Sequence, residues 1–272
     1  MFPEIFRIHV VFFVLSGFLI TTLLLEEYDL SGRVSLRNFF IRRGLRLLPL
    51  AYAATVIIVV FSVVSGASVS YYLKSALTCT FYVGNYFTLL FSGHEHLAPA
   101  FRHFWTLAVE EQFYLVWPAV VTVALGRSAR AHRTLLVITI LGVVAGLFVR
   151  ACFLIQGVTV SVFTFSHIDA LLIGSVVAQL RHMGKDVNPW ILDRLGHWLM
   201  GVVLAVCAFS PMFNLEANLG MRYTLVAISG AALIVASGGS RSSKILSIRP
   251  LVEVGKFSYG LYVIHWPVYL GV

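Results

Sequence analysis

Long apolar runs separated by short polar loops make up most of this chain. A helix that crosses a bilayer needs roughly 17–25 mostly apolar residues. Eight runs qualify as spans, and a ninth, Ser75–Gly93, is uncharged but more polar. The eight runs lie at about 10–26, 47–65, 104–125, 134–153, 163–180, 195–212, 221–238 and 257–271. This pattern predicts an all-α integral membrane protein, a polytopic helical bundle of about eight spans.

The composition supports lipid as the solvent of these runs. Of the 272 residues, 59% are hydrophobic and 12% are charged, whereas soluble domains carry about 25% charged residues. A soluble surface could not be covered with so few polar groups. Since no linker, low-complexity tract or internal repeat stands out, we predict a single membrane domain over residues 1–272.

The basic residues fix the orientation of the bundle, because cytoplasmic loops of membrane proteins carry an excess of Lys and Arg. The loops after the first, third, fifth and seventh runs carry 15 of the 20 basic residues. We therefore place these alternate loops in the cytoplasm and the N-terminus outside. The net charge of +8 is then loop charge, which argues against a nucleic-acid-binding surface.

The same alternation decides the topology of the ninth run. If Ser75–Gly93 crossed the membrane, every later loop would change sides, and the basic loop Arg127–Arg133 would face outward. We therefore expect Ser75–Gly93 to be an interfacial or re-entrant segment on the outer side.

We single out four ionisable residues that lie well inside predicted spans, where each costs about 2.5–3.5 kcal/mol on insertion scales. They are Glu110, Glu111, Asp169 and His265. One alternative for each is a structural buried pair. Adjacent helical residues point about 100° apart, so Glu110 and Glu111 need two sets of donors or a polar cavity. We expect these groups to line a polar tunnel that joins the two membrane surfaces, with the carboxylates in its outer half.

Arg42, Arg43 and Arg46 form a basic cluster at the cytoplasmic end of the second span. On a helix, positions three and four apart share a face, and guanidinium groups suit phosphate oxygens. The cluster is either a site for a phosphorylated donor or an ordinary positive anchor at the lipid headgroups, and the residues alone leave both open.

The remaining candidates for metal or redox chemistry are weak. Cys79, Cys152 and Cys207 are widely spaced in apolar surroundings, which indicates inert buried thiols. A polar cluster on the outer side comprises His94, Glu95, His96, Arg102 and His103. It lacks a fixed third ligand, so we expect acceptor contact or a solvated loop and no metal site.

Five motifs together resemble the acyltransferase-3 family of bacterial membrane O-acyltransferases. They are VFFVLSGFLIT (11–21), FFIRRGLRLLPL (39–50), FRHFWTLAVEEQFYLVWP (101–118), HIDALLIGSVVA (167–178) and GKFSYGLYVIHWPV (255–268). Each motif alone is unspecific, but five in order and at the expected spacing, including EEQFY and RRxxR, are highly specific.

The resemblance implies a multi-pass enzyme of the bacterial cytoplasmic membrane. Such an enzyme moves an acyl group, often acetyl, from cytoplasmic acyl-CoA to a hydroxyl of an extracytoplasmic glycan or lipid-linked acceptor, with acyl-CoA as co-substrate and no bound cofactor. Arg43 and Arg46 match the family's RxxR motif, to which Arg42 is adjacent, and suit the CoA phosphates. Glu110, Glu111, Asp169, Tyr259 and His265 match positions that line the interior. Glu110, Glu111, Asp169 and His265 are the catalytic candidates. Arg102, His103 and Tyr259 are assigned to the acceptor side.

The sequence also departs from the family pattern. The family's first helix carries an essential His, and neither that helix nor the family's tenth helix is present. His9 falls in the second family helix, and Val10 replaces an Asp that is common in the family. We therefore expect an incomplete chain that lacks the proton-handling His. Two alternatives to an acyltransferase remain, a secondary transporter and a non-catalytic membrane pseudoenzyme. Transporters usually show internal repeats and paired broken helices, which this sequence lacks.

Overall fold

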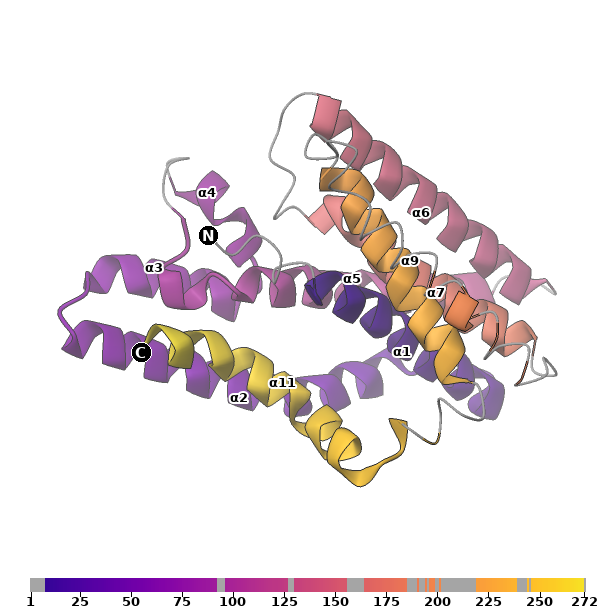
Figure 1. Ribbon diagram of the computed structural model, residues 1–272, viewed down its shortest axis with the longest axis horizontal. Helices are drawn as coiled ribbons and strands as arrows, with labels where there is room; N and C mark the ends of the chain where they lie inside the picture. Colours follow the sequence, from indigo (N-terminus) through magenta and orange to yellow (C-terminus); the bar gives the residue numbers. More distant parts are fainter. Residues whose placement is uncertain are drawn as a thin grey trace. The chain divides into compact units, whose positions relative to one another are not determined.

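The computed structural model describes residues 8–91, 96–126, 130–155, 164–184, 219–238 and 246–271, with residues 190, 194, 196–198, 201 and 244. Within these residues every regular element is a helix (Figure 1). Four of the helices are long and apolar enough to cross a membrane. The predicted fold class, an all-α polytopic membrane protein, is confirmed.

Seven of the eight predicted runs coincide with long helices. These are α1 (Ile8–Ser31), α2 (Leu36–Val64), α5 (Phe104–Leu125), α6 (Ala131–Ile155), α7 (Ile168–Met183), α9 (Leu219–Ser237) and α11 (Arg249–Leu270). The run at 195–212 lies almost wholly outside the described residues. α2 begins at Leu36 instead of 47, because Ser35 caps it by accepting a hydrogen bond from the Asn38 N–H. The three clustered arginines therefore lie on the helix itself.

The described part of the ninth run contains no helix long enough to cross a membrane. It is divided among the end of α3 (Val69–Thr80), the short 3-10 helix η2 (Gly84–Tyr86) and α4 (Phe87–Leu90), each too short to span a bilayer. The Tyr28 hydroxyl donates to the Leu125 carbonyl at 3.2 Å, so α1 and α5 end on the same side. The short elements α3, η2 and α4 agree with a non-crossing segment at Ser75–Gly93, whose place relative to the membrane stays a prediction.

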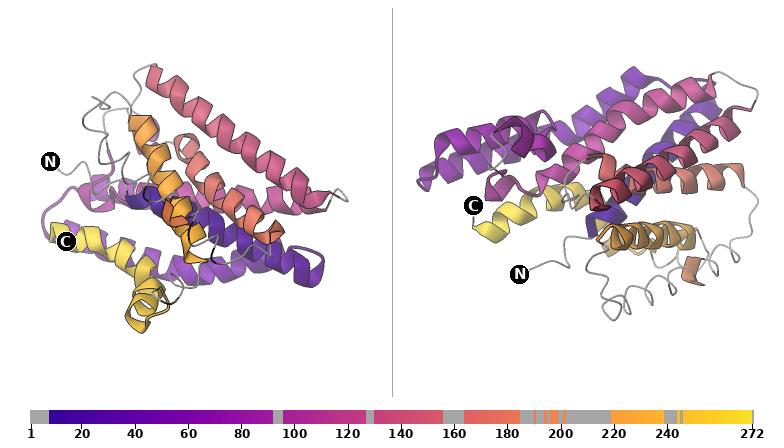
Figure 2. Two further views of the ribbon diagram at one scale, coloured as in Figure 1. Left: turned by 45° about the vertical axis from the view of Figure 1, so that its right-hand side comes forward. Right: turned by 90° about the horizontal axis from the view of Figure 1, so that it is seen from above.

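The chain divides into two compact units. The first comprises Met1–Val34 and Phe113–Ile248, and the second comprises Ser35–Gln112 and Arg249–Val272. In the first unit α1 packs against α7 and α9, and α7 also packs against α6, as Figures 1 and 2 show.

Glycines set the close approach of α1 and α7. A Cβ on Gly17 would lie 1.8 Å from the Leu171 carbonyl oxygen, and one on Gly174 would lie 1.9 Å from the Val14 carbonyl oxygen. In lipid, where apolar association between helices is weak, such small-residue contacts let backbones pack closely. The glycines of the SGFLIT and LLIGS segments therefore have a packing role.

Hydrogen bonds between helices reinforce this contact. The Trp117 indole N–H donates to the Thr21 hydroxyl at 2.9 Å, and that hydroxyl donates to Ser175 at 2.9 Å. The Gln179 amide donates to the Thr139 hydroxyl at 2.8 Å. These bonds join α5, α1, α7 and α6 inside the first unit.

The second unit has its own core, formed by α2, α3, the start of α5 and α11. Its buried members include Ile58, Phe101, Phe104 and Val263. The Ser75 hydroxyl accepts a hydrogen bond from the Ala98 N–H at 3.0 Å, which ties α3 to the segment before α5. Cys79 belongs to this core, and burial raises the pKa of its thiol, as expected for an inert cysteine.

Candidate functional site

An ion pair between α2 and α5 forms the centre of the second unit. The Arg43 guanidinium donates from Nη2 to Glu111 Oε1 at 2.9 Å and from Nε to the same oxygen at 3.2 Å. The side chains of Arg43 and Glu111 keep 20% and 22% of their exposed surface. The pair is therefore fixed in geometry and still open to solvent or a ligand.

Tyr82, which lies between α3 and η2, is near this pair. The Gln112 amide donates to the Tyr82 carbonyl at 2.7 Å and to Asn85 Oδ1 at 3.0 Å. Tyr82 has φ 54°, a backbone conformation that is uncommon outside glycine and that clusters at functional sites. Burial and the charge of Glu111 raise the pKa of the Tyr82 phenol. This hydroxyl therefore keeps its proton and can serve as a hydrogen-bond donor.

Tyr259 of α11 joins the same cluster. Its hydroxyl donates to the Leu47 carbonyl at 3.0 Å, one turn of α2 beyond Arg43, and the ring lies within range of the charges of Arg43, Glu111 and Glu110. Tyr259 and Leu47 each lie about 15–17 Å along a helix that starts on the cytoplasmic side, at about 1.5 Å per residue. We name Arg43, Glu111, Tyr82 and Tyr259 the inner cluster.

The inner cluster brings together residues that the sequence assigns to different depths. The sequence places Arg43 at the cytoplasmic mouth, Glu111 in the outer half of the membrane and Tyr259 on the acceptor side, and these depths stay predictions. The ion pair brings the Arg43 guanidinium and the Glu111 carboxylate into direct contact. Arg42 and Arg46 are exposed, whereas Arg43 turns to Glu111, so the three guanidinium groups do not share one environment.

A second group of polar side chains lies nearer the outer end of α11. The His103 Nε2 bonds the Val263 carbonyl at 3.0 Å, so this nitrogen carries the proton in the neutral ring. The Tyr262 hydroxyl donates to the His103 carbonyl at 2.9 Å and also contacts the Thr106 hydroxyl. His265 Nδ1 lies 2.6 Å from the Tyr262 carbonyl, and its ring centroid is 5.4 Å from that of His103. These four residues, His103, Thr106, Tyr262 and His265, are the outer cluster.

The two histidines of the outer cluster have different surroundings. His103 is buried, and burial lowers the pKa of its imidazole to about 3. His265 is exposed, in contrast to the interior position expected for it. Arg102 and His96 are also exposed, and His94 and Glu95 lie outside the described residues.

Asp169 lies in the first unit, in a closed environment. It forms an ion pair with Arg150, and the side chains keep 0% and 4% of their surfaces. Arg150 also donates from Nη2 to the Ser166 carbonyl at 2.7 Å and from Nη1 to the Thr224 hydroxyl at 3.0 Å. A tunnel lining was expected for Asp169. The structure shows the alternative instead, a structural buried pair, because a cationic partner from α6 neutralises the carboxylate.

Aromatic rings cover this buried pair. The His9 ring centroid lies 5.8 Å from that of His167, and the Tyr223 centroid lies 5.2 Å from that of His167. His9 is buried. Sequence reasoning missed His167, Tyr223 and Arg150. Arg150 could have been found, since it lies near the end of the apolar run at 134–153 and needs a partner there.

The chain is similar to known acyltransferases. A family profile described as "Acyltransferase domain" matches residues 3–272. The chain is 28% identical over 278 residues to the O-acetyltransferase OatA of Staphylococcus aureus, covering 94% of this chain and 45% of that protein. It is 29% identical over 274 residues to the peptidoglycan O-acetyltransferase OatA of Listeria monocytogenes, covering 95% of this chain and 44% of that protein. The chain thus spans less than half the length of these relatives. No solved structure gives a significant match.

Proposed function

This chain belongs to the acyltransferase domain family, and from that premise we propose that it is a membrane O-acyltransferase of the bacterial cytoplasmic membrane. It transfers an acetyl group from acetyl-CoA on the cytoplasmic side to a hydroxyl of an extracytoplasmic acceptor. The names of its relatives favour a peptidoglycan glycan as that acceptor. The observation that carries the proposal is the half-buried Arg43–Glu111 pair, a fixed and accessible cation inside an apolar bundle.

The arginines of α2 serve the donor in this proposal. Arg42 and Arg46 are exposed at the cytoplasmic end of α2 and bind the CoA phosphates. Glu111 is a positioning residue that holds Arg43 in place beside them. Tyr82, which keeps its proton, donates a hydrogen bond to the arriving donor. Acyl-CoA thus enters along α2, with its acyl end directed inward.

The outer cluster serves the acceptor hydroxyl. His265 Nδ1 donates to the Tyr262 carbonyl, so its Nε2 carries a lone pair in the neutral ring, and the ring is exposed. In the reaction the hydroxyl oxygen forms a C–O bond with the acyl carbon and the C–S bond breaks. The hydroxyl proton passes to His265 Nε2 and then to the leaving thiolate. Positioned bases of this kind contribute about 10²–10⁴-fold.

The other predicted site residues receive supporting roles. Arg102 and His103 directly precede α5, and Glu110 lies about two turns into it. In this proposal the three side chains bind the hydroxyls of a glycan acceptor. Asp169 fixes the fold of the first unit through Arg150, and a catalytic role for it stays a prediction.

The test is acetyl transfer by the full chain reconstituted in proteoliposomes. With labelled acetyl-CoA outside or inside, we expect transfer to a glycan acceptor on the opposite face. Arg46→Ala should raise the KM for acetyl-CoA about tenfold, consistent with loss of a charged contact of about 1.5 kcal/mol or more, while His265→Gln should lower kcat. Arg37→Ala, an exposed arginine about two and a half turns before Arg46 on α2, is the matched control.

Two results would contradict the proposal. The first is unchanged acetyl-CoA binding in an Arg42→Ala, Arg46→Ala double variant. The second is solute uptake by the proteoliposomes without any acyl transfer, which would favour the transporter alternative.

A further inference from the structure

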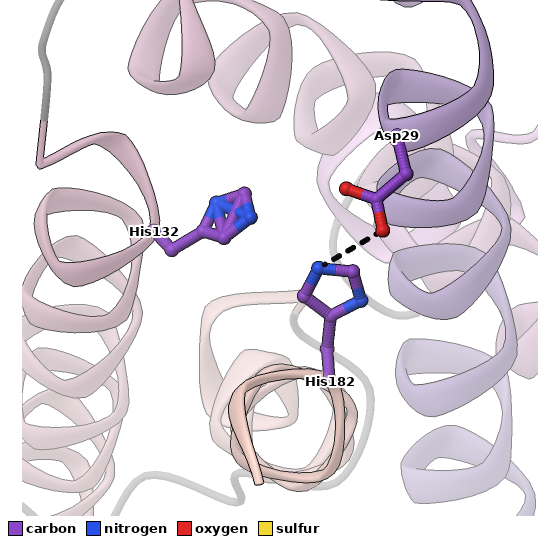
Figure 3. A group of neighbouring side chains, drawn as sticks. All are labelled: Asp29, His132 and His182. Carbon is purple, nitrogen blue, oxygen red and sulfur yellow. Dashed lines mark ion pairs between the residues drawn. The ribbon is translucent and has the colours of Figure 1, made fainter. Parts of the chain in front are cut away.

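Three helix ends of the first unit bring two histidines and a carboxylate together, none of which belongs to the inner or the outer cluster. Asp29 lies near the end of α1, His132 at the start of α6 and His182 at the end of α7. Figure 3 shows the two imidazole rings and the carboxylate facing a common space. By the orientation derived from the basic loops, all three helix ends lie on the cytoplasmic side.

The ligand atoms are already close to one another. One nitrogen from each histidine and one oxygen of Asp29 all lie within 4.8 Å of each other. His182 Nε2 lies 3.5 Å from Asp29 Oδ2, and the two imidazole centroids are 5.0 Å apart. A tetrahedral ion with bonds of about 2.1 Å separates its ligands by about 3.4 Å. The His182–Asp29 distance is already at that value, and His132 completes the set with a small shift.

The surroundings suit a bound ion. His132 and His182 are half-buried and line a small recess with Leu25, Leu135 and Gln179, whereas Asp29 is exposed and gives access from solvent. His132 Nδ1 is buried with no hydrogen-bond partner among the described residues. A plain His182–Asp29 ion pair would leave that nitrogen unsatisfied, and buried polar atoms usually have a partner.

We propose that Asp29, His132 and His182 bind a divalent transition-metal ion, with Zn²⁺ the best fit. Imidazole and carboxylate ligands suit Zn²⁺, and a two-histidine, one-carboxylate set leaves a fourth position for water. The ion ties the cytoplasmic ends of α1, α6 and α7 together. Because its ligands come from three helices, it stabilises their packing without entering the acyl-transfer clusters.

The experiment measures metal binding directly, so its outcome is independent of acyl transfer. The purified full chain in detergent is stripped with EDTA and titrated with Co²⁺, followed by visible absorption, and then with Zn²⁺ by calorimetry. We expect one ion per chain and no thiolate charge-transfer band. Asp29→Asn, His132→Gln and His182→Gln should each weaken Zn²⁺ binding by about tenfold or more, since even outer-shell changes cost 10–100-fold.

Controls keep the proposal falsifiable. His96→Gln removes an exposed histidine of the second unit and should leave binding unchanged. Zn²⁺ should raise the melting temperature of the parent chain but not of His132→Gln, whose metal-free melting temperature reports whether it folds. Failure to bind Zn²⁺, equal binding in a His132→Gln, His182→Gln double variant, or a thiolate band that reveals cysteine ligands would each overturn it.

Discussion

Two arginine–carboxylate pairs in the same chain have opposite surroundings. Arg150 and Asp169 of the first unit keep 4% and 0% of their side-chain surfaces, and Arg150 also bonds Ser166 and Thr224. Arg43 and Glu111 of the second unit keep 20% and 22%. The first pair has no surface left for a ligand, whereas the second is held in place and remains accessible.

The difference in exposure distinguishes an ion pair that stabilises the fold from one that can also contact a ligand. Removing one partner of a buried pair leaves an uncompensated charge and costs about 3–5 kcal/mol, while partly exposed pairs contribute about 0–1 kcal/mol. Stability should therefore depend on Asp169, and donor binding on Glu111. An ionisable residue inside a span is a functional candidate by default, and its partner decides which of these two roles it has.

The largest expected effect comes from breaking the buried pair. Arg150→Ala should lower the free energy of unfolding by about 3–5 kcal/mol, because Asp169 is left charged in a closed site. Unfolding by denaturant in mixed micelles measures the change. An Arg150→Leu, Asp169→Leu double variant is the control and should recover most of the loss. A single variant as stable as the parent would show that the pair carries no structural role.

The glycine contacts of the first unit come next. Gly17→Val should lower the free energy of unfolding by about 1–3 kcal/mol or more, since its Cβ would overlap the Leu171 carbonyl oxygen. Gly255→Ala on α11 is the matched control, because its Cβ meets nothing within 4 Å. Thermal unfolding of the two variants measures the difference in their melting temperatures. Equal melting temperatures would mean that the α1–α7 packing is looser than described.

The buried His103 of the outer cluster should make the stability of the protein depend on pH. Burial lowers the pKa of His103 from 6.5 to about 3, so between these values the unfolded chain binds a proton that the folded chain does not. Stability should therefore fall as the pH drops below 6.5, by about 1.4 kcal/mol per pH unit from this residue. His103→Gln should remove this part of the slope. An unchanged slope in that variant would indicate that His103 is solvated.

The smallest expected effect on stability comes from the accessible pair. Glu111→Gln should cost less than about 1 kcal/mol, because solvent screens both side chains, yet it should raise the KM for acetyl-CoA several-fold by releasing Arg43. Paired stability and kinetic measurements test both halves of the statement. Glu253→Gln breaks the exposed pair with Lys256 and should change neither quantity. A stability loss equal to that of Arg150→Ala would remove the contrast between the two units.

The sequence by itself determined the fold class and the family. Apolar length identifies spans because lipid cannot hydrogen-bond exposed backbone, and the alternating basic loops predict their orientation and a non-crossing segment at Ser75–Gly93. The short motifs were enough to indicate an acyltransferase. Glu110, Glu111, Asp169 and His265 could be singled out because charge is costly in lipid.

Only the tertiary structure decided what each charged group does. Arg150 lies near the end of α6 and Asp169 at the start of α7. The sequence of these segments does not predict that the guanidinium contacts the carboxylate. Likewise Arg43 meets Glu111 across 68 positions, and Asp29, His132 and His182 meet only where three helices end. Hydropathy acts locally on each helix, whereas ion pairs and ligand sets depend on the rotation and depth of helices relative to one another, which are set by packing.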